Sequence, residues 1–178
     1  MRTAMAAGMM LLITNLHAAE RVVVYVDDDT VVDTRTLYCA EYFATRMFAR
    51  IGVSVKWHAG KPPREDAEAM AVSWISGVPE QFRPGALGYA TTFPHSAGRV
   101  FVLADRLNKT ADPVLLPTLL AHVLVHEITH VLEGVSRHSE TGLMKAHWTG
   151  KDYMATAHKP LEFDPVDVNI IHYRLAHR

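Results

Sequence analysis

Hydrophobic and polar positions divide the chain into short apolar or alternating runs and three longer runs with helical spacing. The short runs are rich in β-branched residues, as is typical of strands, whereas apolar residues recur every three or four positions in the long runs. The pattern predicts strands at 21–28, 53–59, 67–76, 86–93 and 99–105, with a helix as the alternative at 67–76. It predicts helices at 32–52, 112–134 and 164–178.

The order of these elements predicts the fold class. A strand, a helix and a strand come first, further strands follow, and the chain ends with a helix, a loop at 135–161 and another helix. We expect an α+β (α/β-like) fold with a mixed, twisted sheet of about five strands and all helices on one side. Asp112 is expected to cap the long helix, Pro113 or Pro117 to occupy its first turn, and Gly134 to end it in a left-handed conformation.

Composition and charge narrow the class of protein. The chain has 178 residues, of which 49% are hydrophobic, and its net charge is −1. This composition is typical of a single globular domain, and the charge favours neither nucleic acid nor an anionic membrane as a partner. A single cysteine, Cys39, excludes an internal disulfide, and we interpret it as a small buried hydrophobic residue.

The first 19 residues have the pattern of a secretory signal peptide. Arg2 provides a positive charge, 3–16 form an apolar run that is short for a membrane span, and small residues precede Glu20. A buried N-terminal helix is the alternative. We therefore predict a signal peptide at 1–19, a single catalytic domain at 20–178 without a membrane span, and a secreted or periplasmic location.

Two histidines and a glutamate in the predicted helix 112–134 have the spacing of a metal site. His126 and His130 are four positions apart, which places both imidazoles on one helical face, one turn from each other. Glu127 can reach a water molecule held by the same metal ion. Chance is the alternative, because the chain contains 11 histidines. The other faces of the helix are apolar and a glycine ends it, which favours the metal site.

Catalytic zinc needs a third protein ligand, with water in the fourth position. His138 is the best candidate, because a sharp turn at Gly134 would carry it back over the first two histidines. His122 precedes His126 by one turn, but three ligands on one helix fit a tetrahedral site poorly, so we interpret His122 as a packed residue. Two further histidines are kept as reserve candidates, His147 and His158.

The stretch "HEITHVLEGVSRHS", followed by "GLM", resembles the metzincin zinc peptidases, and most closely their matrixin-type branch. The resemblance implies that His126, His130 and His138 bind zinc, that Glu127 is the general base, and that Met144 belongs to the methionine turn beneath the metal. The spacing differs from the family pattern, because a glutamate occupies the position of the family's glycine. In this chain the glycine is Gly134, one residue later than in the family pattern. The spacing from Gly134 to His138 is also one residue longer than the family's.

The resemblance also implies an activity. It predicts a secreted endopeptidase with one zinc ion, acting on a peptide or protein substrate that pairs with an edge strand containing Leu87, Gly88, Tyr89 and Ala90. Tyr153 and His147 are weak candidates for stabilising the oxyanion. Two alternatives stay open: an exported zinc-binding protein without turnover, and a peptidase whose third ligand is a downstream glutamate, for which Glu162 is the only candidate.

Overall fold

The structure of the protein is a computed structural model that describes residues 20–27, 31–64, 66, 68–79, 81–93 and 96–177. The predicted signal peptide at 1–19 lies outside the described residues, so it stays a prediction. None of the described helices combines the length and the apolar composition that a membrane crossing requires.

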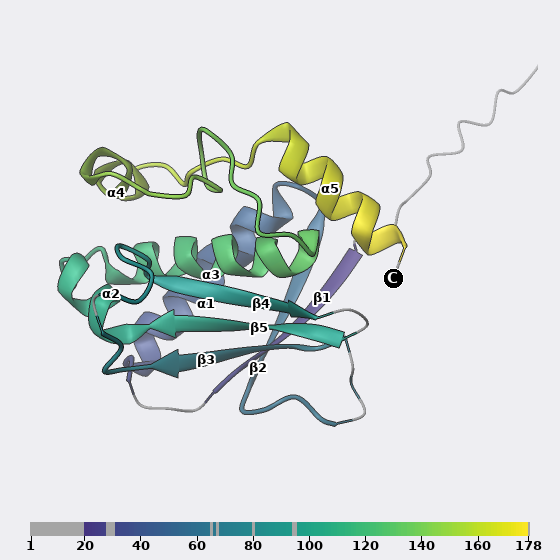
Figure 1. Cartoon of the computed structure of the whole chain (residues 1–178), viewed down its shortest axis with the longest axis horizontal. Coiled ribbons are helices and arrows are strands. Elements are labelled where there is room, and N and C mark those ends of the chain that lie inside the picture. Colours follow the sequence, from purple (N-terminus) through teal and green to yellow (C-terminus); the bar gives the residue numbers. More distant parts are fainter. Residues whose placement is uncertain are drawn as a thin grey trace, which may run out of the picture.

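A five-stranded sheet forms one layer of the fold (Figure 1). Its strands are β1 (Glu20–Val26), β2 (Val53–Ala59), β3 (Met70–Ile75), β4 (Gly88–Phe93) and β5 (Ser96–Leu103). Their order is β2-β1-β3-β5-β4, and only the pairing of β4 with β5 is antiparallel. The predicted α+β fold with a mixed five-stranded sheet is therefore confirmed, and the strand interpretation of 67–76 is correct.

The helices of the described residues are α1 (Thr34–Ala49), α2 (Ala104–Thr110), α3 (Leu116–Glu133), α4 (Gly150–Thr156) and α5 (Pro165–Ala176). The sequence pattern predicted α1, α3 and α5. It missed α2, where we expected the end of a strand, and α4, where we expected only loop. The predicted role of Asp112 is also wrong in part, because its side chain caps the turn before α3 by accepting from the Val114 amide at 2.8 Å, and α3 begins at Leu116.

Burial alternates along the strands, so one face of the sheet is covered. In β1, the alternating residues Val22, Val24 and Val26 are buried, whereas Arg21, at a position of the opposite face, is exposed. This alternation is typical of a sheet with helices on one face, as expected. Figure 1 shows α3 between strands β4 and β5 on one side and the C-terminal segment with α4 and α5 on the other.

The position of α3 explains its composition. It contacts the sheet, α1 and α5, and nearly all of its side chains are buried. A helix that is buried all round must be apolar unless a polar side chain has a specific partner. The polar residues buried on α3 therefore identify the part of the molecule where chemistry is expected. By contrast, Cys39 on α1 is only half-buried, which corrects the prediction that it is a buried core residue.

Candidate metal centre

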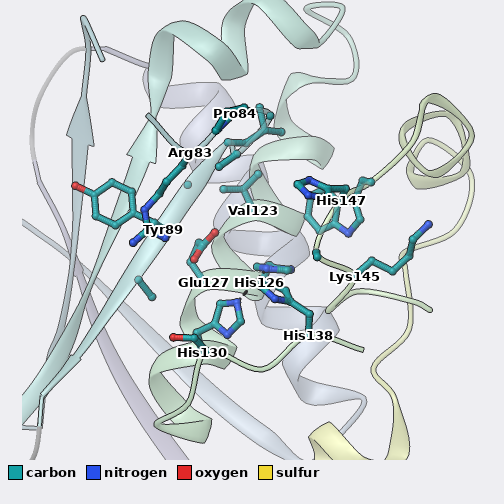
Figure 2. Close-up of a pocket in the computed structure, with 18 of the residues that line it drawn as sticks. Arg83, Pro84, Tyr89, Val123, His126, Glu127, His130, His138, Lys145 and His147 are labelled. Atoms are coloured by element: carbon teal, nitrogen blue, oxygen red, sulfur yellow. Dashed lines mark hydrogen bonds between the residues drawn. The ribbon is translucent and has the colours of Figure 1, made fainter. Parts of the chain in front are cut away.

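Helix α3 places two imidazoles and one carboxylate at the base of a cavity (Figure 2). His126, Glu127 and His130 each expose 7% of their surface. The two histidines are one helical turn apart, so their rings meet, and their Nε2 atoms are 3.2 Å from each other. The predicted arrangement of His126 and His130 on one face of a helix is therefore present in the structure.

A turn at the end of α3 returns the chain to the two histidines. Gly134 has a φ angle of +67°, a left-handed conformation that costs little for glycine, and its amide donates to the carbonyls of His130 and Val131. After this turn His138 lies against both rings. One ligand nitrogen from each of His126, His130 and His138 lies within 4.8 Å of the others. No other group of three such side chains that could hold a metal ion is found in the described residues.

The hydrogen bonds of the first two histidines determine which ring nitrogen is free. The Nδ1 atom of His126 is 2.9 Å from the Leu143 carbonyl, and the Nδ1 atom of His130 is 3.2 Å from the Val135 carbonyl. A carbonyl oxygen can only accept, so both Nδ1 atoms carry the proton and both Nε2 atoms carry a lone pair. The Nε2 atoms that face each other therefore repel. A cation between them would remove this repulsion, so the donor set fits zinc.

Burial keeps these imidazoles neutral. The pKa of His126 is lowered to about 3 and that of His130 to about 4, mainly by desolvation and also by neighbouring histidines, against the opposite effect of their backbone hydrogen bonds. The pKa of His138 is also lowered, first by burial and then by His147. A lowered pKa leaves an imidazole unprotonated at neutral pH, which is the form that binds a metal ion.

The predicted methionine lies in the segment that holds His126. The Leu143 carbonyl accepts from His126 Nδ1 and, at 3.0 Å, from Trp148 Nε1. Met144 is fully buried, and its carbonyl accepts from the Ser139 amide at 2.8 Å. Residues 143–144 therefore connect two candidate ligands, one through the His126 ring and the other through the residue after His138.

A buried aspartate on α5 holds the chain on both sides of His138. Asp167 is 1% exposed and forms an ion pair with Arg137, while its other oxygen is 3.3 Å from the Ser139 hydroxyl. The residues before and after His138 are thus anchored to one carboxylate. His138 itself is exposed, and these contacts fix the backbone from which its ring reaches the cluster.

The side chain of Glu127 lies between the histidines and the edge of the sheet. A Cβ atom on Gly88 would lie 3.1 Å from Glu127 Cγ and 3.0 Å from the Phe101 carbonyl, so a larger residue would crowd strand β4 against this side chain. Burial raises the pKa of Glu127 to about 8, while the charge of Arg83 acts in the opposite direction. A divalent cation in the histidine cluster would also lower this pKa, because an opposite charge favours the carboxylate.

The cavity above these residues has a volume of about 340 Å³. One wall is the start of strand β4 with the loop before it, and the opposite wall is segment 145–148 with Tyr153. All four predicted edge-strand residues line it: Leu87, Gly88, Tyr89 and Ala90. Strand β4 is the last strand of the sheet on this side, so one of its edges has no partner strand in the described structure.

The remaining candidates from the sequence lie elsewhere or have other contacts. Both ring nitrogens of His122 are occupied, Nδ1 by the Thr118 carbonyl at 2.7 Å and Nε2 by the Leu161 amide at 3.1 Å, so this fully buried residue is a packed one. His147 and Tyr153 line the cavity, whereas His158 is exposed outside it. Glu162 pairs with Lys159 at 2.6 Å on the surface, away from the cluster.

Three residues of the site were not found from the sequence. Asp167 supports the segment around His138 from α5, and the Trp148 ring packs edge-on against the His126 ring at a centroid distance of 5.5 Å. Arg83 lines the cavity from a loop that has no recognisable motif. The aspartate lies near the start of α5, where an acidic residue is expected for helix stability alone. The sequence therefore contains no signal that distinguishes its role from that common use.

Glu133, the last residue of α3, is buried beside the carboxyl group of Asp167. It is 2% exposed, and neither carboxylate oxygen has a well-formed hydrogen bond in the described structure, although the Asp167 carboxyl is close enough to raise its pKa. Burial, and then the charge of Asp167, raise its pKa to about 7, while Arg137 opposes them. Arg174 lies close by, since its guanidinium is within 2.5 Å of the position of a Cβ on Gly134. An unpaired buried carboxylate is costly, so Glu133 should weaken the folded state when ionised.

We expect Glu133→Gln to stabilise the protein in a pH-dependent way. The folded pKa exceeds the unfolded value of 4.5, so the folded chain binds the extra proton and stability falls as pH rises from 4.5 to about 7. The uncharged amide removes this loss, which should raise the free energy of unfolding by about 2 kcal/mol at pH 8 and change it little at pH 4.5. Thermal and urea unfolding at both pH values measure the difference.

Glu140→Gln is the matched control, because Glu140 is exposed in the same segment. It should leave the unfolding free energy nearly unchanged at both pH values. A destabilised Glu133→Gln variant at pH 8 would contradict the interpretation and indicate that the carboxylate forms a favourable contact.

Comparison with known proteins supports the fold. No model of a known protein family matches the chain, and no curated protein matches its sequence. The crystal structure of archaemetzincin from Methanopyrus kandleri is similar with a TM-score of 0.60 and 13% identity, over 90% of this chain and 99% of that chain. The GM1-bound form of the ECX AB5 holotoxin is similar with a TM-score of 0.50 and 14% identity, over 86% of this chain and 80% of that chain. The chain therefore has an archaemetzincin-like fold.

Proposed function

We propose that the protein is a zinc-dependent endopeptidase. The observation that carries the proposal is the convergence of His126, His130 and His138 beside the carboxylate of Glu127, at the base of a cavity bounded by an edge strand. The fold agrees with the proposal, since the motif resembles metzincins and a structure named archaemetzincin has a similar fold.

The three histidines would hold zinc through neutral imidazole nitrogens. His126 and His130 are already in the required tautomer, because their Nδ1 protons are donated to backbone carbonyls. Zinc bound there would supply Lewis-acid chemistry, which polarises a peptide carbonyl and makes water a better nucleophile near neutral pH. Asp167 and the segment with Met144 would keep the three ligands in place.

Glu127 would move the proton during hydrolysis. Its carboxylate is next to the ligands in the chain but is not among the clustered ligand atoms, so it stays available as a base. It would accept a proton from the attacking water and then donate it to the leaving amine. Only 7% of the surface of Glu127 is exposed. The proton would therefore pass between substrate and side chain with little bulk water present.

Strand β4 would bind the substrate in an extended conformation. Its partner β5 uses one edge, and the other edge faces the cavity side where its main-chain groups can pair with a peptide. Main-chain pairing fixes the position of the peptide without reading its side chains. This mode agrees with an endopeptidase, because it does not require a chain end.

The test is cleavage of a mixed peptide library by the zinc-loaded chain. We expect cleavage that a chelator abolishes and that added zinc restores, because metal removal leaves the histidine nitrogens without the ion that activates the substrate. A fully zinc-loaded chain that cleaves no peptide and no protein substrate would contradict the proposal. That result would instead favour an exported zinc-binding protein without turnover.

We also propose that the protein is exported and acts on peptides or proteins outside the cytoplasm. This part rests on the sequence of residues 1–19 alone. N-terminal sequencing of the exported product tests it, and a mature chain that keeps Met1 would contradict it.

A further inference from the structure

The loop between β3 and β4 is held rigidly by one arginine of helix α2. Arg106 Nη1 donates to the carbonyls of Arg83 at 2.7 Å and Ala86 at 3.1 Å. Its Nη2 donates to the carbonyls of Pro79 at 2.9 Å and Phe82 at 2.6 Å. Charge-assisted hydrogen bonds of this kind are the stronger ones, and four of them hold the backbone at Pro79, Phe82, Arg83 and Ala86. This segment forms part of the cavity wall, so its shape is set before a ligand arrives.

Arg83 is presented by this loop in an unusual backbone conformation. Its φ angle is +46°, and it is the one non-glycine residue with a positive φ in the described chain. Such a conformation costs energy and persists where the surroundings determine it, often at a binding site. The guanidinium carbon lies 4.8 Å from the ring centre of Tyr89 and 5.7 Å from that of Phe82. Figure 2 shows the side chain beside the Tyr89 ring, between this ring and Glu127 in the view.

The charge of Arg83 is not balanced by an ion pair with any described residue. Lys145, the other lysine or arginine that lines the cavity, pairs with Asp152 at 2.7 Å. Among the described lining residues Glu127 is the only acid. The cavity thus presents one guanidinium without an ion-pair partner among the described residues, and its charge lowers the pKa of Glu127.

The two walls of the cavity come close to each other near the loop that carries Arg83. Gly85 faces the opposite wall, since a Cβ atom on Gly85 would lie 3.9 Å from His147 Nδ1. Arg83 itself is exposed, so a substrate group that enters the cavity can reach it. The planar guanidinium can donate two parallel hydrogen bonds to one carboxylate.

We propose that Arg83 binds a carboxylate of the substrate, so that the enzyme selects peptides with an acidic group close to the cleaved bond. The carboxylate belongs to an aspartate or glutamate side chain or to the C-terminus of the peptide. Arg83 then determines specificity, and Arg106 positions it. This inference rests on the proposed peptidase function, because it concerns the substrate of the same site.

The experiment compares matched peptides on the zinc-loaded full chain. One pair differs only by glutamate against glutamine at each position near the cleaved bond, and a second pair differs only by a free against an amidated C-terminus. Two readouts are measured, kcat/KM for cleavage and the Kd for binding to the zinc-loaded Glu127→Ala chain by fluorescence anisotropy. The two pairs distinguish a side-chain carboxylate from a terminal one.

We expect the wild type to prefer the acidic member of one pair by about tenfold, and Arg83→Gln to lose this preference. Arg83→Lys should keep part of it, and higher salt should reduce it. The matched control is Arg46→Gln, because Arg46 also lies over a tyrosine ring, that of Tyr42 at 5.7 Å, but is on α1 outside the cavity. This control should keep the full preference.

Two results would overturn the proposal. The first is a wild type without preference for either acidic peptide in both readouts. The second is an Arg83→Gln variant that loses activity equally on acidic and neutral peptides, which would show that Arg83 acts on Glu127 or on the loop instead of the substrate. If the wild type cleaves no peptide, the peptidase proposal fails, and the binding readout still decides whether Arg83 selects a carboxylate.

Discussion

Replacing Glu127 by alanine or glutamine is expected to lower kcat for peptide cleavage by about 10²–10⁴-fold, and zinc content should not change. The reason is the position of the carboxylate. Glu127 directly follows His126 on α3, but its carboxylate is not one of the three clustered ligand groups, which all belong to histidines. The variants therefore remove a proton acceptor and leave the metal-binding nitrogens intact.

The stability of these variants should also differ from that of an ordinary core substitution. Burial raises the pKa of Glu127 to about 8, which shows that the folded chain disfavours the charged form at this position. Glutamine has nearly the same shape and no charge, so Glu127→Gln should melt at the same temperature as the metal-free wild type or above it. Glu127→Ala removes most of a buried side chain and should be the less stable of the two.

The measurement combines zinc content, thermal melting and cleavage of a mixed peptide library, on wild type and both variants together. Glu140→Gln is again the control, since it removes an exposed carboxylate from the segment that carries His138. Equal cleavage by the wild type and the Glu127 variants would exclude this residue as the base. Loss of zinc along with activity would show that the carboxylate contributes to metal binding.

The parts of the site that could be predicted from the sequence depend on local geometry. Positions 126 and 130 share a helical face in any α-helix, and a glycine after a long apolar run ends it in a left-handed turn. The same rule explains the unusual spacing. Relative to the metzincin pattern, one extra residue separates His130 from Gly134, and α3 here runs through Glu133 to the left-handed Gly134. The other extra residue lies between Gly134 and His138. His138 therefore still reaches the other two histidines.

The parts that were missed depend on contacts between distant residues or on weak signals. Helix α4 is seven residues long, and its start is fixed by a capping box between Thr149 and Asp152. This local signal was present in the sequence and could have identified the helix. Helix α2 follows β5 without a break and lacks a side-chain cap, so its start has no comparable signal. The roles of Arg106 and Asp167 arise only when helices α2 and α5 meet loop residues that are more than 20 positions away in the chain.

Replacing His138 by alanine is expected to weaken zinc binding by more than about 100-fold. Removal of a group that only supports a ligand lowers metal affinity by roughly 10–100-fold. Removal of a ligand itself should therefore lower the affinity by more. The structure supports this position for the third ligand, since the His138 ring centre lies 5.4 Å from that of His126 and 4.8 Å from that of His130. Competition with a chelating dye at neutral pH measures the Kd for zinc in each variant.

Asp167→Asn tests how the third ligand is held. Asparagine keeps the shape of the side chain and loses the charge that pairs with Arg137, so the backbone on both sides of His138 should become less fixed. We expect a loss of zinc affinity of about tenfold, smaller than for His138→Ala. A variant with wild-type affinity would show that the loop positions His138 without this ion pair.

Three other histidines make the assignment of His138 falsifiable. His158→Ala should leave zinc affinity unchanged, because that residue is exposed outside the cavity. His122→Ala should reduce stability more than affinity, since both of its ring nitrogens are already engaged by backbone groups, one of them from the distant Leu161. His147 lines the cavity and is the strongest rival. If His138→Ala kept full zinc affinity while His147→Ala lost it, His147 would be the third ligand, and segment 145–148 would have to move toward α3 when the metal binds.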